Sequence, residues 1–152
     1  MRCSVASVIV PVMLMVCLAA PSLAANPGRH PAYLHALSDL RDARAHLERS
    51  GSEREDHKEE RAIAKIDTAI NEIKHAAIDD GKDINDHVLV DAQLARAGRF
   101  HKALELLDKA KDDVSREEDQ ADTRGLQLRV IHHIDEARKE VRRVIATVLN
   151  HT

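Results

Sequence analysis

The octapeptide Ile66-Asp67-Thr68-Ala69-Ile70-Asn71-Glu72-Ile73 returns 68 residues later as Ile134-Asp135-Glu136-Ala137-Arg138-Lys139-Glu140-Val141. The isoleucine and valine positions have the 3-4 spacing of a helix that buries one side. The shared acids are not required by that spacing, because they lie beside the apolar stripe. An earlier pair of segments matches at an offset of 67 residues, with Tyr33 on Phe100 and Leu40 on Leu107. These matches predict a duplicated helical hairpin.

Four stretches carry one-sided apolar stripes and are predicted to be helices, at about 32–49, 53–78, 99–116 and 123–149. We therefore expect an all-α fold, a four-helix bundle of two tandem, similar hairpins at 32–78 and 99–149, joined by a linker at 79–98. Ser52-Glu53-Arg54-Glu55 predicts a capping box at the start of the second helix, and Gly81 is placed to end it. The expected core includes Leu40, Ile66, Ile70, Leu107, Ile134 and Val141.

The linker is long for a connection inside one domain. We expect it to cross the bundle as an overhand connection, with Val88, Leu89, Val90 and Leu94 tucked against the helices. The turn between the last two helices is less defined, because residues 115–123 are polar but contain no Gly or Pro. A single long helix is the alternative there.

The N-terminus has the order of a secretory signal peptide. Arg2 precedes an apolar run, Pro21 breaks it, and Ser22 and Ala24 are small residues at the −3 and −1 positions of a cut after Ala24. Residues 1–24 are predicted to be removed, residues 25–31 to form an extended entry segment, and the mature chain to be periplasmic or secreted. An uncleaved membrane anchor is the alternative, because the run approaches the length of a spanning helix.

Composition excludes several kinds of site. Both cysteines and all three methionines lie in residues 1–24, so the predicted mature chain has no disulfide, thiolate metal site or Met-ligated haem. That segment has one basic and no acidic residue, which leaves 22 Lys and Arg against 26 Asp and Glu and a net charge of −4. The acidic excess argues against a nucleic acid partner, and no spanning segment is expected in the mature chain.

Ten histidines in the mature chain suggest a transition-metal site for Zn²⁺, Cu²⁺ or Ni²⁺. On helical wheels, His35, His46, His75 and His132 lie opposite their apolar stripes. His101 and His133 lie at stripe borders, so His101, His132 and His133 are the candidate ligands. Carboxylates one turn away could assist: Asp39 for His35, Glu105 for His101 and Glu136 for His132. Equally, such pairs can decorate a solvated helix face.

Two more specific metal motifs fail. Glu72 and His75 match the Glu-x-x-His element of di-iron bundles, but the second half has Arg143 where its histidine should be. The Asp-rich stretch from Asp83 lacks the glycine and final glutamate of a calcium loop. A helix stop and an Asx-turn account for it. The repeated acids, Asp67 with Asp135 and Glu72 with Glu140, are predicted to form ion pairs with basic residues of partner helices.

The stretches 30–41, 70–74, 78–82, 101–107 and 133–137 resemble those of a group of small, uncharacterised secreted or periplasmic bacterial all-helical proteins. The resemblance implies export and a helical fold, and it brings no activity with it.

The sequence therefore predicts a non-enzymatic binding or structural module that meets an envelope or periplasmic protein, with self-association open. A metal-binding protein is the alternative. Outward-facing histidines beside acids would have raised pKa values, so we expect the fold to keep its stability between about pH 7 and 5.

Overall fold

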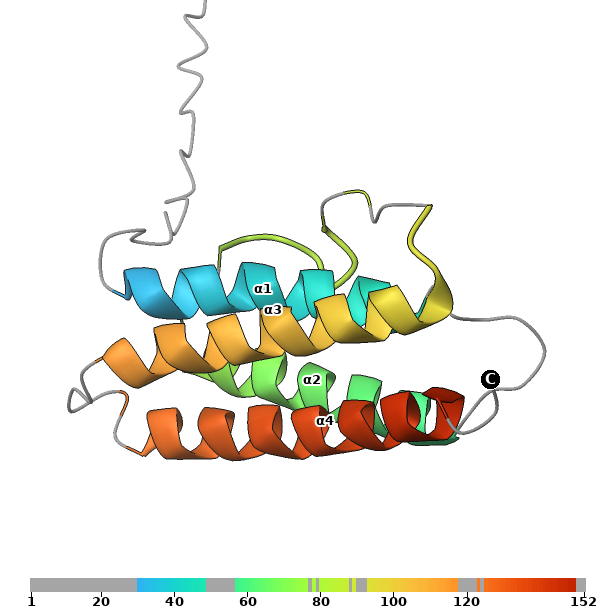
Figure 1. Ribbon diagram of the computed structural model, residues 1–152. Helices are drawn as coiled ribbons and strands as arrows, with labels where there is room; N and C mark the ends of the chain where they lie inside the picture. Colours follow the sequence, from blue (N-terminus) through green and yellow to red (C-terminus); the bar gives the residue numbers. More distant parts are fainter. Residues whose placement is uncertain are drawn as a thin grey trace, which may run out of the picture.

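The computed structural model describes residues 30–48, 57–76, 80–87, 93–117 and 125–149, together with Ile78, Leu89 and Thr123. These residues form four helices and no strand: α1 (Pro31–Glu48), α2 (His57–His75), α3 (Arg96–Arg116) and α4 (Leu126–Leu149). The helices pack as a closed ring in which α1 contacts α3, α3 contacts α4, α4 contacts α2, and α2 contacts α1 (Figure 1). The predicted all-α four-helix bundle is confirmed.

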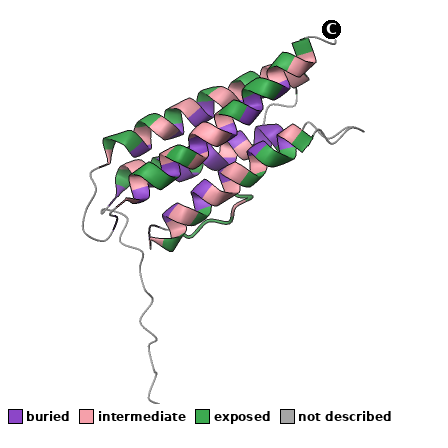
Figure 2. Ribbon diagram, turned by 90° about the horizontal axis from the view of Figure 1, so that it is seen from below, coloured by how far each residue is buried: buried purple, intermediate pink, exposed green. Residues whose placement is uncertain are grey.

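One apolar core runs through the centre of this ring (Figure 2). The buried stripes of the four helices meet there, because each helix spaces its apolar residues three and four positions apart. Tyr33 and Phe100, the two aromatic residues that match at the offset of 67, are both fully buried. All six residues predicted for the core are at most 1 % exposed: Leu40, Ile66, Ile70, Leu107, Ile134 and Val141.

Neighbouring helices in the ring run antiparallel. On the α2–α4 side, Lys58 donates to Thr147 at one end, and Arg129 donates to Glu72 at the other. Because α4 is antiparallel to both α2 and α3, these two helices run in the same direction. The connection between them must therefore return along the whole bundle, roughly 28 Å for a helix of nineteen residues. This is the physical reason for the long linker, and the predicted overhand crossing is confirmed.

The crossing segment, residues 76–95, lies along α1 (Figure 1). Arg41 pairs with Asp80, and the Nη1 of Arg44 donates to the Oδ1 of Asn85 at 3.1 Å. Ile84 packs against the core cluster between these contacts and the end of the segment. Leu89 is 94 % exposed, so the prediction that it tucks against the bundle is wrong. Val88 and Val90 lie outside the described residues.

The helix boundaries differ from the prediction mainly at α2. This helix ends at His75, and Gly81 has its left-handed φ of 72° within the crossing segment instead of at the helix end. The capping box at 52–55 lies outside the described residues. Between α3 and α4, Glu117 is extended and Gly125 again has a φ of 72°, so the alternative of one long helix is wrong.

Ion pairs recur in the two halves at the offsets found in the sequence. The pair Arg44–Asp67 joins α1 to α2 at 2.8 Å, and Lys111–Asp135 joins α3 to α4 at 2.8 Å in the matching positions. Across the other interface, Arg61–Glu140 and Arg129–Glu72 exchange the matching positions of α2 and α4, at 3.3 and 2.8 Å. This is the pattern that a duplicated hairpin would retain, and the duplication itself stays a prediction.

Candidate functional site

The three candidate metal ligands do not converge on one point. His132 and His133 are adjacent, with ring centroids 5.4 Å apart, because they follow each other on α4. The Nδ1 of His101 lies 2.8 Å from the carbonyl oxygen of Ala97 on its own helix. Lys111 pairs with Asp135, so His101 lies about 15 Å further along α3 from the level of the histidine pair. In the part of the chain that the structure describes, no three His, Cys, Asp or Glu residues could hold a metal ion together.

The carboxylates expected beside the exposed histidines contact lysines instead. Asp39 accepts from Lys109 at 2.9 Å, Glu105 accepts from Lys102 at 2.8 Å, and Glu136 lies 3.9 Å from Lys65. These pairs form because α1 meets α3 and α2 meets α4 in directions that a single helical wheel does not contain. Their geometry gives the metal alternative no support.

His46 is buried, so its predicted exposure to solvent is wrong. The side of α1 that a wheel assigns to solvent is covered in the bundle. Burial lowers the pKa of His46, the charges of Lys102 and Arg99 lower it further, and Asp42 partly opposes them. The pKa of His133 is lowered as well, first by burial and then by His132 and Lys65. Neither shift is the rise that the sequence predicts for histidines beside acids.

Hairpin one holds the crossing segment through a buried charge. Arg41 is 1 % exposed, and its guanidinium pairs with Asp80 of the segment. Burial works to raise the pKa of Asp80, but the hydrogen bond and charge of Arg41 outweigh it and lower that pKa. In hairpin two, Asp108 stands in the position of Arg41 and pairs directly with Arg138 of α4. Arg138 matches Ile70, so hairpin one has an isoleucine where hairpin two has this partner.

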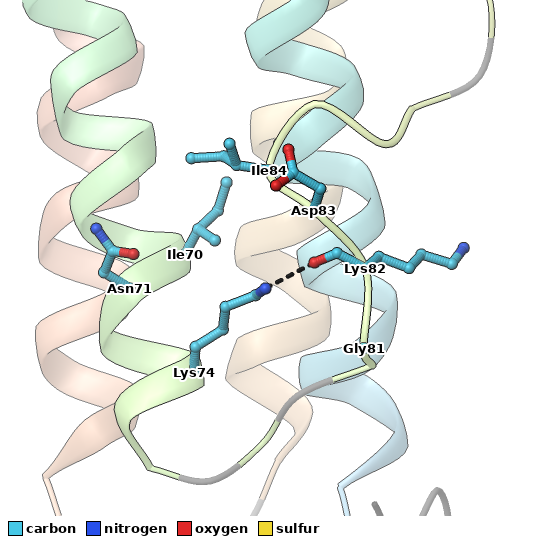
Figure 3. Close-up of a pocket in the computed structure, with 7 residues that line it drawn as sticks. All are labelled: Ile70, Asn71, Lys74, Gly81, Lys82, Asp83 and Ile84. Carbon is cyan, nitrogen blue, oxygen red and sulfur yellow. Dashed lines mark hydrogen bonds between the residues drawn. The ribbon is translucent and has the colours of Figure 1, made fainter.

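A pocket of about 510 Å³ lies between α2 and the crossing segment (Figure 3). Ile70, Asn71 and Lys74 line it from α2, and residues 81–84 line it from the segment. Lys74 reaches across and donates to the carbonyl oxygen of Lys82 at 2.7 Å, while the Lys82 side chain extends away. The pocket is open, and its charged groups do not face one point, so it has no arrangement for catalysis.

The outer face of α4 combines apolar and basic residues, and the sequence interpretation missed it. The α4 stripe is the set of residues on this face at alternating spacings of four and three: Leu128, His132, Asp135, Lys139, Arg142, Ala146 and Leu149. Leu128 and Leu149 are 70 % and 61 % exposed, and Leu89 is the other exposed large apolar residue among those described. The spacing itself was the available signal, because it runs opposite the buried stripe of the same helix.

Two cations in the middle of the α4 stripe make no contact with an acid. Within the described residues, Lys139 and Arg142 have neither an ion pair nor a side-chain hydrogen bond. The other basic residues of α4 are paired: Arg129 with Glu72, Arg138 with Asp108 and Asp135, and Arg143 with Glu140. The single acid of the stripe, Asp135, is neutralised by Lys111 and Arg138, which lower its pKa although burial opposes them.

The opposite side of the bundle is acidic. The crossing segment contains five aspartates and one lysine, an excess equal to the whole net charge of the predicted mature chain. It lies along α1, and α1 is diagonal to α4 in the ring, without a contact between them. The molecule is therefore polarised, with an acidic side at the crossing segment and a basic strip on α4.

Comparison of the chain with models of protein families, with curated proteins and with solved structures finds no match. None of the described helices has the length and apolar character needed to cross a membrane.

Proposed function

We propose that this chain is a small exported, non-enzymatic helical-bundle protein that binds an anionic membrane surface of the bacterial envelope through the α4 stripe. The observation that carries the proposal is the pair of uncompensated cations, Lys139 and Arg142, between the exposed leucines 128 and 149. The signal-peptide pattern of residues 1–24 supports the compartment.

The physical argument rests on charge and on exposed apolar area. A Lys or Arg near an anionic membrane surface contributes about 1 kcal/mol to binding. Exposed leucines at the two ends of the stripe, roughly 32 Å apart along the helix, can enter the boundary between headgroups and acyl chains. Solvent-exposed apolar residues that line up on one face are typical of interaction surfaces.

The charge polarity of the molecule would orient it on such a surface. Anionic headgroups attract α4 and repel the crossing segment, with its aspartates at 80, 83 and 86. The segment and Leu89 would then face away from the membrane.

Binding of the purified protein to vesicles tests the proposal. We expect sedimentation with phosphatidylglycerol vesicles, weaker binding as salt rises, and no binding to phosphatidylcholine vesicles. Charge reversal in Lys139→Glu with Arg142→Glu should weaken binding at least 30-fold, from about 1 kcal/mol for each lost cation and further repulsion. Lys82→Glu with Arg116→Glu is the matched control, because it changes the net charge equally on other surfaces.

Two results would contradict the proposal. Equal losses in both double variants would mean that net charge alone drives binding. If the α4 variant binds vesicles normally but changes the oligomeric state in solution, then the stripe is a contact between two copies of the chain. Leu128→Ser with Leu149→Ser separates the apolar contribution and should weaken binding at high salt more than at low salt.

A further inference from the structure

His46 is an unusual group in this bundle, because it is a buried imidazole with an unpartnered nitrogen. Its side chain is 7 % exposed, and its Nδ1 finds no hydrogen-bond partner within the described part of the chain. Buried polar nitrogens are nearly always hydrogen-bonded, because an unmet one costs about 1–3 kcal/mol. A group left in this state calls for an explanation beyond packing.

The charges around His46 are mostly positive. On α1 itself, Asp42 lies one turn before it and is the acid that faces it. From α3, Arg99 and Lys102 face it, and from the crossing segment His87 does. A proton on His46 would therefore place a buried cation beside two permanent cations and another histidine, with one acid to offset them. The neutral imidazole fits this site, and the charged one does not.

The crossing segment is the part of the surroundings that can yield. On either side of His46, α1 and α3 are fixed by fully buried residues, among them Ala43, Leu47 and Phe100. The segment is held near His46 by weaker contacts, the exposed hydrogen bond from Arg44 to Asn85 and the half-buried Ile84. Local opening follows the lowest density of buried contacts, so the segment moves before either helix does.

We propose that His46 is a proton-sensitive seat for the crossing segment: when acid charges the imidazole, residues 83–87 leave α1 and the ring gains access to water. His87, once protonated, adds repulsion in the same direction. The inference does not depend on membrane binding, because it concerns the opposite side of the bundle.

Hydrogen exchange in residues 82–87, measured at pH 7.5, 6.5 and 5.5 and corrected for the intrinsic pH dependence, tests the proposal. We expect the corrected exchange of the wild-type segment to rise on acidification, by up to about tenfold per pH unit. The core of α3 should show no comparable rise. His46→Leu should remove the pH dependence, and His35→Leu, the matched control at an exposed position of α1, should leave it unchanged. The same pH dependence in His46→Leu and the wild type would overturn the proposal, as would none in the wild type.

A second measurement does not require a variant at His46 to fold. Coupling is reciprocal, so a segment that is loosened must in turn make His46 easier to protonate. Ile84→Ala removes an anchor of the segment and leaves His46 in place. By NMR titration, the pKa of His46 should be below the ordinary value near 6.5 in the wild type and rise toward it in Ile84→Ala. An identical pKa in both proteins would show that the segment does not control the group.

Discussion

Truncation of Leu107 to alanine tests the central layer of the bundle. Leu107 on α3 and Leu40 on α1 are both fully buried, and they occupy matching positions of the two halves. The ion pair Asp39–Lys109 places them at one level of the antiparallel α1–α3 interface. They therefore belong to one layer, and removal of either side chain opens the same region of the core.

The expected cost follows from the atoms removed. Leu→Ala deletes three carbons, about 2.4 kcal/mol at 0.8 kcal/mol for each buried methylene, and the residual cavity raises the loss to about 2–5 kcal/mol. For a domain of about 120 ordered residues, this loss lowers the Tm by roughly 8–20 °C. Because their positions match, Leu40→Ala and Leu107→Ala should agree within about 1 kcal/mol.

Urea unfolding followed by circular dichroism gives the free energy of unfolding for each variant. Leu128→Ala is the control of the same chemistry, and at its exposed position it should change stability by less than about 0.5 kcal/mol. A loss below about 1 kcal/mol for Leu107→Ala would refute the assignment of this layer to the core. A difference above about 2 kcal/mol between the two buried variants would refute the equivalence of the halves.

Three further predictions concern the buried charge, the histidines and export. Asp80→Ala should cost about 3 kcal/mol, because it leaves the Arg41 guanidinium buried without its partner, and adding Arg41→Met should recover part of the loss in urea unfolding. The pKa values of His46 and His133 are lowered in the fold, so the unfolded chain takes up protons first and stability falls as pH drops below about 6.5. The Tm should therefore decrease from pH 7.5 to 5.5, and His46→Leu should reduce the decrease; a constant Tm would contradict the burial of these rings. Mass spectrometry of the periplasmic fraction should find a mature N-terminus after Ala24, and an intact N-terminus in the membrane fraction would disprove cleavage.

The sequence expectation for pH is reversed by the structure at particular residues. On the wheel, His35, His101 and His132 each had a carboxylate one turn away, which predicted raised pKa values. In the bundle these carboxylates contact Lys109, Lys102 and Lys65. Asp39 is itself buried, and burial raises its pKa more than Lys109 lowers it. Partners from another helix decided each case, and a wheel of one helix does not contain them.

The candidate surface was within reach of the sequence, whereas its charge was not. Leu128, Lys139, Arg142 and Leu149 have a regular spacing opposite the buried stripe, so their place on the outer face of α4 follows from periodicity alone. Which cations of α4 remain uncompensated depends on contacts across interfaces. Arg129 is paired because α2 brings Glu72 to it, and Lys139 is not because no acid approaches.

The sequence by itself determined the four helices, their buried stripes and the need for a long connection. These properties are local, since the spacing of apolar residues every three to four positions fixes both helix and inner face. Only the tertiary structure decided that the crossing segment lies on α1, that Ile84 and not Leu89 anchors it, and that His46 is buried. These outcomes depend on a third element that covers a helix side already facing away from the core. Burial there follows from the direction in which α2 and α3 run, which no single stretch of the chain encodes.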